Sequence, residues 1–78
     1  MADANVHVID ARGSFCPGPM MELIRAVKAA EVGQLISVLS NDSGSQRDIP
    51  KWAEKAGQEF IGIESHDGYD EITVRKVR

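Results

Sequence analysis

Apolar and polar residues change their spacing soon after the chain begins. Residues 5–11 alternate loosely around Val6 and Val8, which predicts a first strand. After a break at residues 12–14, apolar side chains recur at three- and four-residue steps with charged side chains on the opposite face, as in an amphipathic helix. Gly33 is expected to end this helix, because glycine adopts the left-handed backbone conformation without steric cost. The apolar stripe comprises Met20, Leu23, Ile24, Val27 and Ala30.

A strand and a second, shorter helix are predicted next. Residues 35–39 form a nearly continuous apolar run, typical of a strand near the middle of a sheet, and residues 41–45 have the composition of a loop. Asp48 is expected to cap the helix that follows, with Pro50 in its first turn. Gly57 marks its end. The buried stripe of this helix is expected to comprise Ile49, Trp52, Ala53 and Ala56.

Two more strands complete the expected fold. They span residues 60–64 and 71–77, and the Asp67-Gly68 pair between them is typical of a hairpin turn. A strand–helix–strand unit joins parallel strands by a right-handed crossover. The element order β-α-β-α-β-β therefore predicts an α/β two-layer sandwich, in which a mixed four-stranded sheet carries both helices on one face. We expect residues 1–78 to form one domain.

Composition and charge narrow the class of protein. The chain has 42% hydrophobic residues, 27% charged residues and a formal net charge of −3, which argues against nucleic acid as a direct partner. No apolar run is long enough to cross a membrane, and the N-terminus lacks the pattern of a secretory signal. With a single cysteine, Cys16, no internal disulfide can form. We therefore expect a cytoplasmic protein with a free thiol and no membrane contact.

The segment Cys16-Pro17-Gly18-Pro19 carries the candidate chemistry. A residue before proline is held extended, so Cys16 is expected just outside the first helix. Either Pro17 or Pro19 can occupy the first helical position. The thiol would then lie beside the positive end of the helix dipole, which favours the nucleophilic thiolate. The free N–H groups of Gly18 and Met20 are expected to face the sulfur. A lone cysteine can instead be a buried hydrophobic residue.

Topology predicts further residues near this thiol. The C-terminal ends of parallel strands lie at one edge of a sheet, where ligands of open α/β sheets bind. Cys16 follows the first strand and the loop of residues 41–47 follows the second, so Arg47 could lie near Cys16 and favour its thiolate. Arg47 could equally be a solvated charge at a helix start. We interpret Asp48 as a cap, Met20 as a core residue and Met21 as partly exposed.

At these residues the chain resembles the TusA-like (SirA-like) family of small sulfur-carrier proteins. The resemblance covers nearly the whole chain, from Asp10-Ala11-Arg12-Gly13 through Cys16-Pro17-Gly18-Pro19 to Arg47-Asp48-Ile49-Pro50. It implies a β-α-β-α-β-β sandwich, in agreement with the pattern above. It also implies that Cys16 accepts sulfane sulfur as a persulfide and passes it on. The resemblance also implies supporting positions around that cysteine. They are Pro17, Gly18, Pro19, Met20, Arg47 and Asp48.

The resemblance implies a cysteine desulfurase or rhodanese-like donor protein and a separate acceptor protein. Its implied pathways are tRNA thiolation, cofactor biosynthesis and sulfur metabolism. A carrier of this kind is expected to be monomeric when free, to need no cofactor and to turn over only with partner enzymes. Gly18 departs from members that have a larger or charged residue between the prolines, which can change partner choice. The alternative is a regulatory protein-interaction module of the SirA-like type without sulfur transfer.

No other chemistry is predicted. His7 and His66 are far apart in the sequence and, with one cysteine, do not form a recognised zinc spacing, so we expect both at the surface and no metal site. The chain has no phosphate-binding glycine motif. A redox sensor is a third hypothesis, but a solitary cysteine has no resolving partner within the chain.

Overall fold

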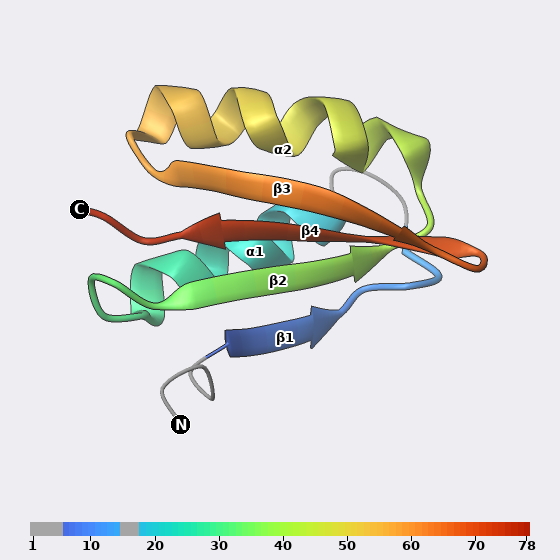
Figure 1. Cartoon of the computed structure of the whole chain (residues 1–78), viewed down its shortest axis with the longest axis horizontal. Coiled ribbons are helices and arrows are strands. Elements are labelled where there is room, and N and C mark those ends of the chain that lie inside the picture. The colour runs from blue at the N-terminus through green and yellow to red at the C-terminus, as the bar shows by residue number, and fades with distance from the viewer. Residues whose placement is uncertain (1–5, 15–17) are drawn as a thin grey trace.

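A computed structural model of the protein describes residues 6–14 and 18–78, and it has the predicted order of elements. Cys16 and Pro17 lie outside the described residues. Figure 1 shows a sheet with helices behind it and along its upper edge. The elements are β1 (Val6–Asp10), α1 (Gly18–Ala29), β2 (Leu35–Ser40), α2 (Ser43–Ala56), β3 (Glu59–His66) and β4 (Tyr69–Arg75).

The sheet is mixed and has the strand order β1-β2-β4-β3. β1 runs parallel to β2, with Val6 opposite Leu35 and Asp10 opposite Leu39. β4 is antiparallel to both of its neighbours, β2 and β3. The parallel pair confirms that the C-terminal ends of the first two strands share one edge of the sheet, so the segments that follow them begin close together.

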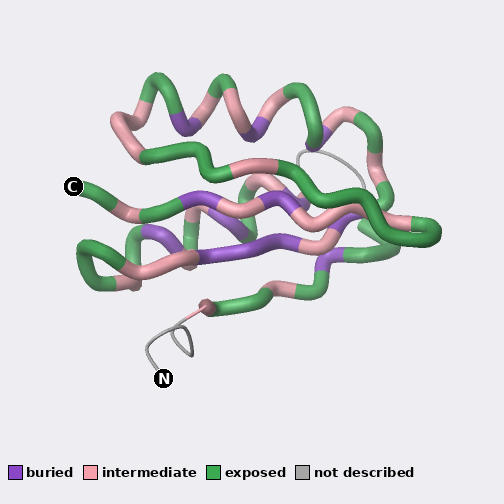
Figure 2. The backbone as a smooth tube through the Cα atoms, in the orientation of Figure 1, coloured by how far each residue is buried: buried purple, intermediate pink, exposed green. Residues whose placement is uncertain are grey.

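Both helices pack on one face of this sheet, and the core lies between the two layers. Alternate residues of β2 and β4 point to the helices, because side chains of a strand alternate between its faces. Figure 2 shows the buried positions concentrated along these two central strands and the inner sides of the helices. Trp52, predicted in the buried stripe of the second helix, is partly buried and packs against the core. The buried core residues are Ala11, Leu23, Val27, Ile36, Val38, Ile49, Ala53, Ile72 and Val74.

The second helix begins earlier than predicted, and Asp48 does not cap it. Asp42 occupies the N-cap position with an extended backbone (φ −101°, ψ 119°), and α2 starts at Ser43. Glycine and serine are weak helix formers, which is why residues 43–45 resemble a loop in the sequence. Tertiary contacts outweigh that weakness here: the Ser45 side chain is fully buried, and the Ser40 hydroxyl donates to the Ser45 hydroxyl at 3.3 Å.

The early start places Pro50 inside α2 instead of in its first turn. Proline has no N–H, so the carbonyl of Gln46 loses its helical partner. The helix continues through this position because Ile49 and Ala53, on either side of the proline, are completely buried. Gly57 ends the helix as predicted, with a left-handed φ of 77°.

The end of α1 also differs from the prediction. This helix ends at Ala29, and Gly33 lies farther along, in the turn before β2, with φ 98°. The Gly33 N–H donates to the carbonyl of Lys76 at 2.6 Å, which binds this turn to the C-terminal end of the sheet. Gly33 therefore positions the entry to β2 instead of capping α1.

The face of the sheet away from the helices is open. On this face the hydroxyls of Ser37 and Thr73 are 2.7 Å apart on neighbouring strands. Exposed apolar side chains also occur in the sheet, with Val8 52% and Ile61 45% exposed. Among the described residues, neither helix is both long and apolar enough to cross a membrane.

Candidate functional site

A tight turn follows β1 and directs the chain toward residues 15–17. The Ala11 N–H still pairs with the carbonyl of Leu39 at 2.9 Å, and the Ser14 N–H donates back to the carbonyl of Ala11 at 3.1 Å. Gly13 has a φ of 92°, the sign required at the third position of a type II turn. A side chain at this position would strain the backbone, so glycine fixes the direction in which the chain leaves the sheet.

This turn is bound to the loop that follows β2. The Gly13 N–H donates to Oδ1 of Asn41 at 3.0 Å, although the two residues are 28 positions apart. At the same loop the Asp42 N–H donates to the Ser40 hydroxyl at 3.1 Å. The predicted meeting of the two segments at one sheet edge is thus confirmed, with Asn41 as the residue that joins them.

Asp10 and Arg12 form an ion pair beside the turn. Arg12 donates from Nε to Asp10 Oδ1 and from the terminal nitrogen to Oδ2, both at 2.8 Å, and its backbone N–H also reaches Oδ1 at 3.1 Å. The hydrogen bonds from the Arg12 side chain, and then from its backbone, lower the pKa of Asp10 to about 2. Both side chains are about half exposed, so the pair contributes little to stability.

The start of α1 has the features that favour an anion. Gly18 begins the helix and Pro19 follows, with its side chain fully buried. Proline is suited to the first turn because an N–H there has no carbonyl of the helix to bind. The first turn contains no acidic residue, so no carboxylate of that turn offsets the positive end of the helix dipole.

The two methionines after Pro19 differ in exposure, as the sequence predicts. Met20 is partly buried and packs against the core, whereas the Met21 side chain is 52% exposed. Burial of Pro19 and Met20 anchors the beginning of α1 to the sheet.

Ser14 and Gly18 are the described residues on either side of residues 15–17, and they lie near each other. The predictions made for Cys16 and Pro17 lie outside the described residues and stay predictions. A Cβ built on Gly18 would lie 3.4 Å from the Cβ of Ser14, an ordinary van der Waals contact, so the flanking ends are near each other. Gly18 also lacks a positive φ. Among the described residues, neither backbone conformation nor contact with a Cβ requires glycine at position 18.

Arg47 and Asp48 lie within α2 and not in a loop before it. The Arg47 side chain is 71% exposed, and its Nε is 4.0 Å from Oδ1 of Asp48. These residues are adjacent in the sequence, so their contact brings no distant element to the site. Whether Arg47 favours a Cys16 thiolate remains a prediction, because Cys16 is not among the described residues.

Asp10, Arg12 and Asn41 were not predicted as site residues. A signal for the first two was available, because an acidic residue at the end of the first strand is followed two positions later by an arginine of opposite charge. For Asn41 the signal was weaker: a polar residue directly after the second strand was assigned only to a loop. Its role depends on the parallel register, which brings it opposite the Arg12-Gly13 turn.

Comparisons with known proteins agree with this arrangement. The sequence profile described as "Sulfurtransferase TusA" matches residues 7–76. A putative sulfur carrier protein of Archaeoglobus fulgidus is 48% identical over 71 residues, which cover 91% of this chain and 97% of that relative. The sulfur carrier protein TusA of Pseudomonas savastanoi pv. phaseolicola is 35% identical over 69 residues, with 88% of this chain and 82% of that relative covered.

A solved structure shares the fold. The crystal structure of the SirA-like protein from Desulfitobacterium hafniense superimposes with a TM-score of 0.80 and 28% sequence identity, and the match covers 94% of this chain and 99% of that one. It supports the two-layer arrangement found here. With a profile match across nearly the whole sequence and a relative identical at almost half of the aligned positions, the chain belongs to the TusA family of sulfur-carrier proteins.

Proposed function

We propose that this protein carries sulfur as a persulfide on Cys16, which it receives from one protein and delivers to another. The observation that carries the proposal is the anchored start of α1 directly after Cys16. Pro19 is buried there and no acidic residue occupies the first turn. A helix N-terminus of this kind stabilises a thiolate, so the pKa of the Cys16 thiol is expected below its usual value.

The transfer needs no cofactor. The Cys16 thiolate attacks the outer sulfur of a donor persulfide, R–S–SH, and a bond forms between the Cys16 Sγ atom and that sulfur. The donor S–S bond breaks and its electron pair leaves with the donor as R–S⁻. In the second step a nucleophile of the acceptor attacks the terminal sulfur and Cys16 departs as its thiolate. The sulfane sulfur moves without net oxidation of the carrier.

The residues around Cys16 would serve mainly to present it. Gly13 and Asn41 fix the chain before the cysteine, and Pro19 and Met20 fix the helix after it. Pro17 would keep Cys16 extended, because the residue before a proline is excluded from the helical region. Gly18 has no side chain, so it would add no bulk beside Cys16 when a partner approaches. Arg47 and Asp48 are proposed as charged contacts of a partner, since the Arg47 side chain is largely exposed.

The donor and acceptor are proposed by class. A cysteine desulfurase or a rhodanese-like protein would provide the persulfide, and the acceptor would use it in tRNA thiolation, cofactor biosynthesis or sulfur metabolism. The names of the relatives, sulfur carrier protein and TusA, support transfer of sulfur in general.

Sulfur loading tests the proposal. Purified protein is incubated with a cysteine desulfurase and L-cysteine, or with a rhodanese-type enzyme and thiosulfate, and the intact mass is measured. We expect a gain of one sulfur atom that a reductant removes. Cys16→Ser should gain none. Met21→Gln serves as a matched control, because Met21 is exposed beside the start of α1 and its replacement leaves the thiol intact. No gain with either donor class, or an equal gain in Cys16→Ser, would contradict the proposal.

A further inference from the structure

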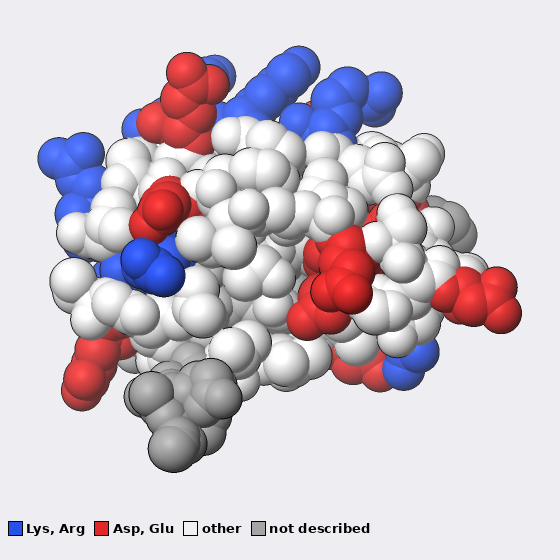
Figure 3. Space-filling model, viewed as in Figure 1, with Lys and Arg blue, Asp and Glu red and all other residues white. Residues whose placement is uncertain are grey.

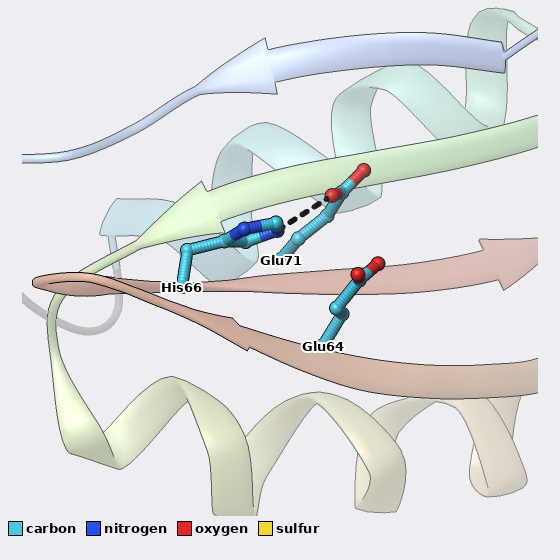
Figure 4. Close-up of side chains that lie close together, drawn as sticks. All are labelled: Glu64, His66 and Glu71. Atoms are coloured by element: carbon cyan, nitrogen blue, oxygen red, sulfur yellow. Dashed lines mark hydrogen bonds and ion pairs between the residues drawn. The ribbon is translucent and has the colours of Figure 1, made fainter.

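Three side chains capable of binding a metal converge on the open face of the β3–β4 hairpin. Glu64 and His66 lie two residues apart on β3, so they point to the same side, and Glu71 lies on β4 directly opposite Glu64. One ligand atom from each residue can be chosen so that all three are within 4.8 Å of one another. Figure 4 shows the two carboxylates and the imidazole on adjacent strands, with the His66–Glu71 contact as a dashed line.

The fold alone does not account for this cluster. Like charges directly opposite each other on neighbouring strands are destabilising. His66 contacts only one of the two carboxylates: its Nε2 is 3.2 Å from Oε1 of Glu71. Within residues 6–14 and 18–78, the Glu64 carboxylate forms neither a hydrogen bond nor an ion pair. A cation held between the two carboxylates would remove the repulsion.

Arg12, which lies over the Tyr69 ring next to the cluster, pairs with a different carboxylate. The Arg12 guanidinium lies over the Tyr69 ring, with its central carbon 4.9 Å from the ring centroid, and it donates both side-chain hydrogen bonds to Asp10. It does not pair with Glu64 or Glu71. Figure 3 shows acidic side chains gathered on the hairpin side of this face, while Lys and Arg side chains lie along the edge formed by α2. The surroundings of the cluster therefore favour a cation.

The imidazole is held in position for binding. The rings of His66 and Tyr69 are stacked, with centroids 4.9 Å apart and an interplanar angle of 19°. His66 and Tyr69 are also directly opposite each other in the strand register. The stacking fixes the ring plane while Nε2 points to the carboxylate of Glu71. The side chains of His66 and Glu71 are 32% and 27% exposed, so an ion has access from solvent.

We propose that Glu64, His66 and Glu71 form a binding site for a divalent transition-metal ion of the Zn²⁺ type. One imidazole nitrogen and two carboxylate oxygens match the preferences of such ions, whereas Ca²⁺ and Mg²⁺ prefer oxygen ligands alone. Ligands about 2.1 Å from a zinc ion lie at most ~4.2 Å apart, so small side-chain rotations bring the three atoms into range. Water would occupy the remaining positions.

The proposed metal site does not include Cys16, so it can be tested in protein that lacks this thiol. Metal titration of Cys16→Ser protein by isothermal calorimetry with Zn²⁺ excludes binding by the thiol. We expect one ion per chain. Glu64→Gln and His66→Gln should each weaken binding about tenfold or more, since loss of a residue that merely orients a ligand already weakens metal affinity by ~10–100-fold.

Matched controls are available in the same sheet. Glu59→Gln removes an exposed carboxylate at the far end of β3, where it pairs with Arg75, and His7→Gln removes a histidine of β1; neither should change the affinity. Addition of Zn²⁺ should shift the amide NMR signals of Glu64, His66, Tyr69 and Glu71. The proposal is overturned if no ion binds, if the Glu64 and His66 variants bind as tightly as the parent, or if the shifted signals lie elsewhere.

Discussion

The backbone N–H of Gly13 donates a 3.0 Å hydrogen bond to Oδ1 of Asn41, and this bond joins the turn before Cys16 to the loop after β2. The two loops follow parallel strands and share one edge of the sheet. The bond thus couples the turn after β1 to the segment that leads into α2. Several consequences can be measured.

Replacement of Asn41 tests this coupling. Asn41→Ala removes the acceptor, and the free energy of unfolding should fall by about 1 kcal/mol, the usual effect of one lost hydrogen bond. Sulfur loading of Cys16 should also slow, because the turn before it is less fixed. Asn41→Asp keeps an acceptor oxygen and is the control. Equal loading rates in Asn41→Ala and the parent would show that this bond does not position Cys16.

Gly13→Ala tests the backbone conformation of the turn. Gly13 has a φ of 92°, while a Cβ built there meets no described atom within 4 Å. The cost is therefore conformational, and we expect a loss of about 1–2 kcal/mol in denaturant unfolding. Gly62→Ala is the comparison, since Gly62 has equal space but no positive φ. If the two variants were equally stable, the strained turn would not be needed.

Substitutions at Gly18 separate folding from thiol chemistry. A Cβ there makes only an ordinary 3.4 Å contact with Ser14 among the described residues, so Gly18→Gln and Gly18→Glu should both fold. Glu adds a negative charge to the first turn and should raise the pKa of the Cys16 thiol relative to the Gln variant. The pH dependence of alkylation by iodoacetamide measures this difference. Identical profiles would mean that the thiol is remote from the start of α1.

The Asp10–Arg12 pair predicts a pH effect. Hydrogen bonds from Arg12 lower the pKa of Asp10 to about 2, below the 3.8 of a free carboxyl. A lowered pKa in the folded state means that the stabilisation is complete above pH ~4 and is lost as the pH falls through about 2. NMR titration of the Asp10 carboxyl carbon should show this low midpoint. In Arg12→Gln the midpoint should rise toward the ordinary value, and an unchanged midpoint would exclude Arg12 as its cause.

Much of the fold followed from local patterns. The apolar stripe of α1 and the Asp67-Gly68 turn predicted their elements because local spacing and turn chemistry dominate there; Gly68 has the positive φ, 90°, that the turn needs. The residue at which α2 begins could not be predicted from local sequence patterns. It depends on burial of Ser45 and its contact with Ser40, which tertiary packing creates.

The candidate sites likewise combine features that local sequence predicts with features that depend on how the strands pair. The motif at Cys16 was visible in the sequence, but the Gly13–Asn41 bond depends on the register of β1 with β2. The cluster on the hairpin could have been found, because a two-residue turn at 67–68 places His66 opposite Tyr69 and Glu64 opposite Glu71. The spacing of the two histidines along the chain gives no sign of it, because its side chains come together only through the pairing of β3 with β4.

Cyanolysis of the loaded protein tests the central claim most directly. The protein is loaded by its donor and separated from it, and cyanide is then added to take up sulfane sulfur as thiocyanate. We predict one thiocyanate per chain, the return of the mass to that of the unloaded protein, and none from Cys16→Ser. A loaded protein that releases no thiocyanate, or a Cys16→Ser protein that releases as much, would contradict transferable sulfur on Cys16.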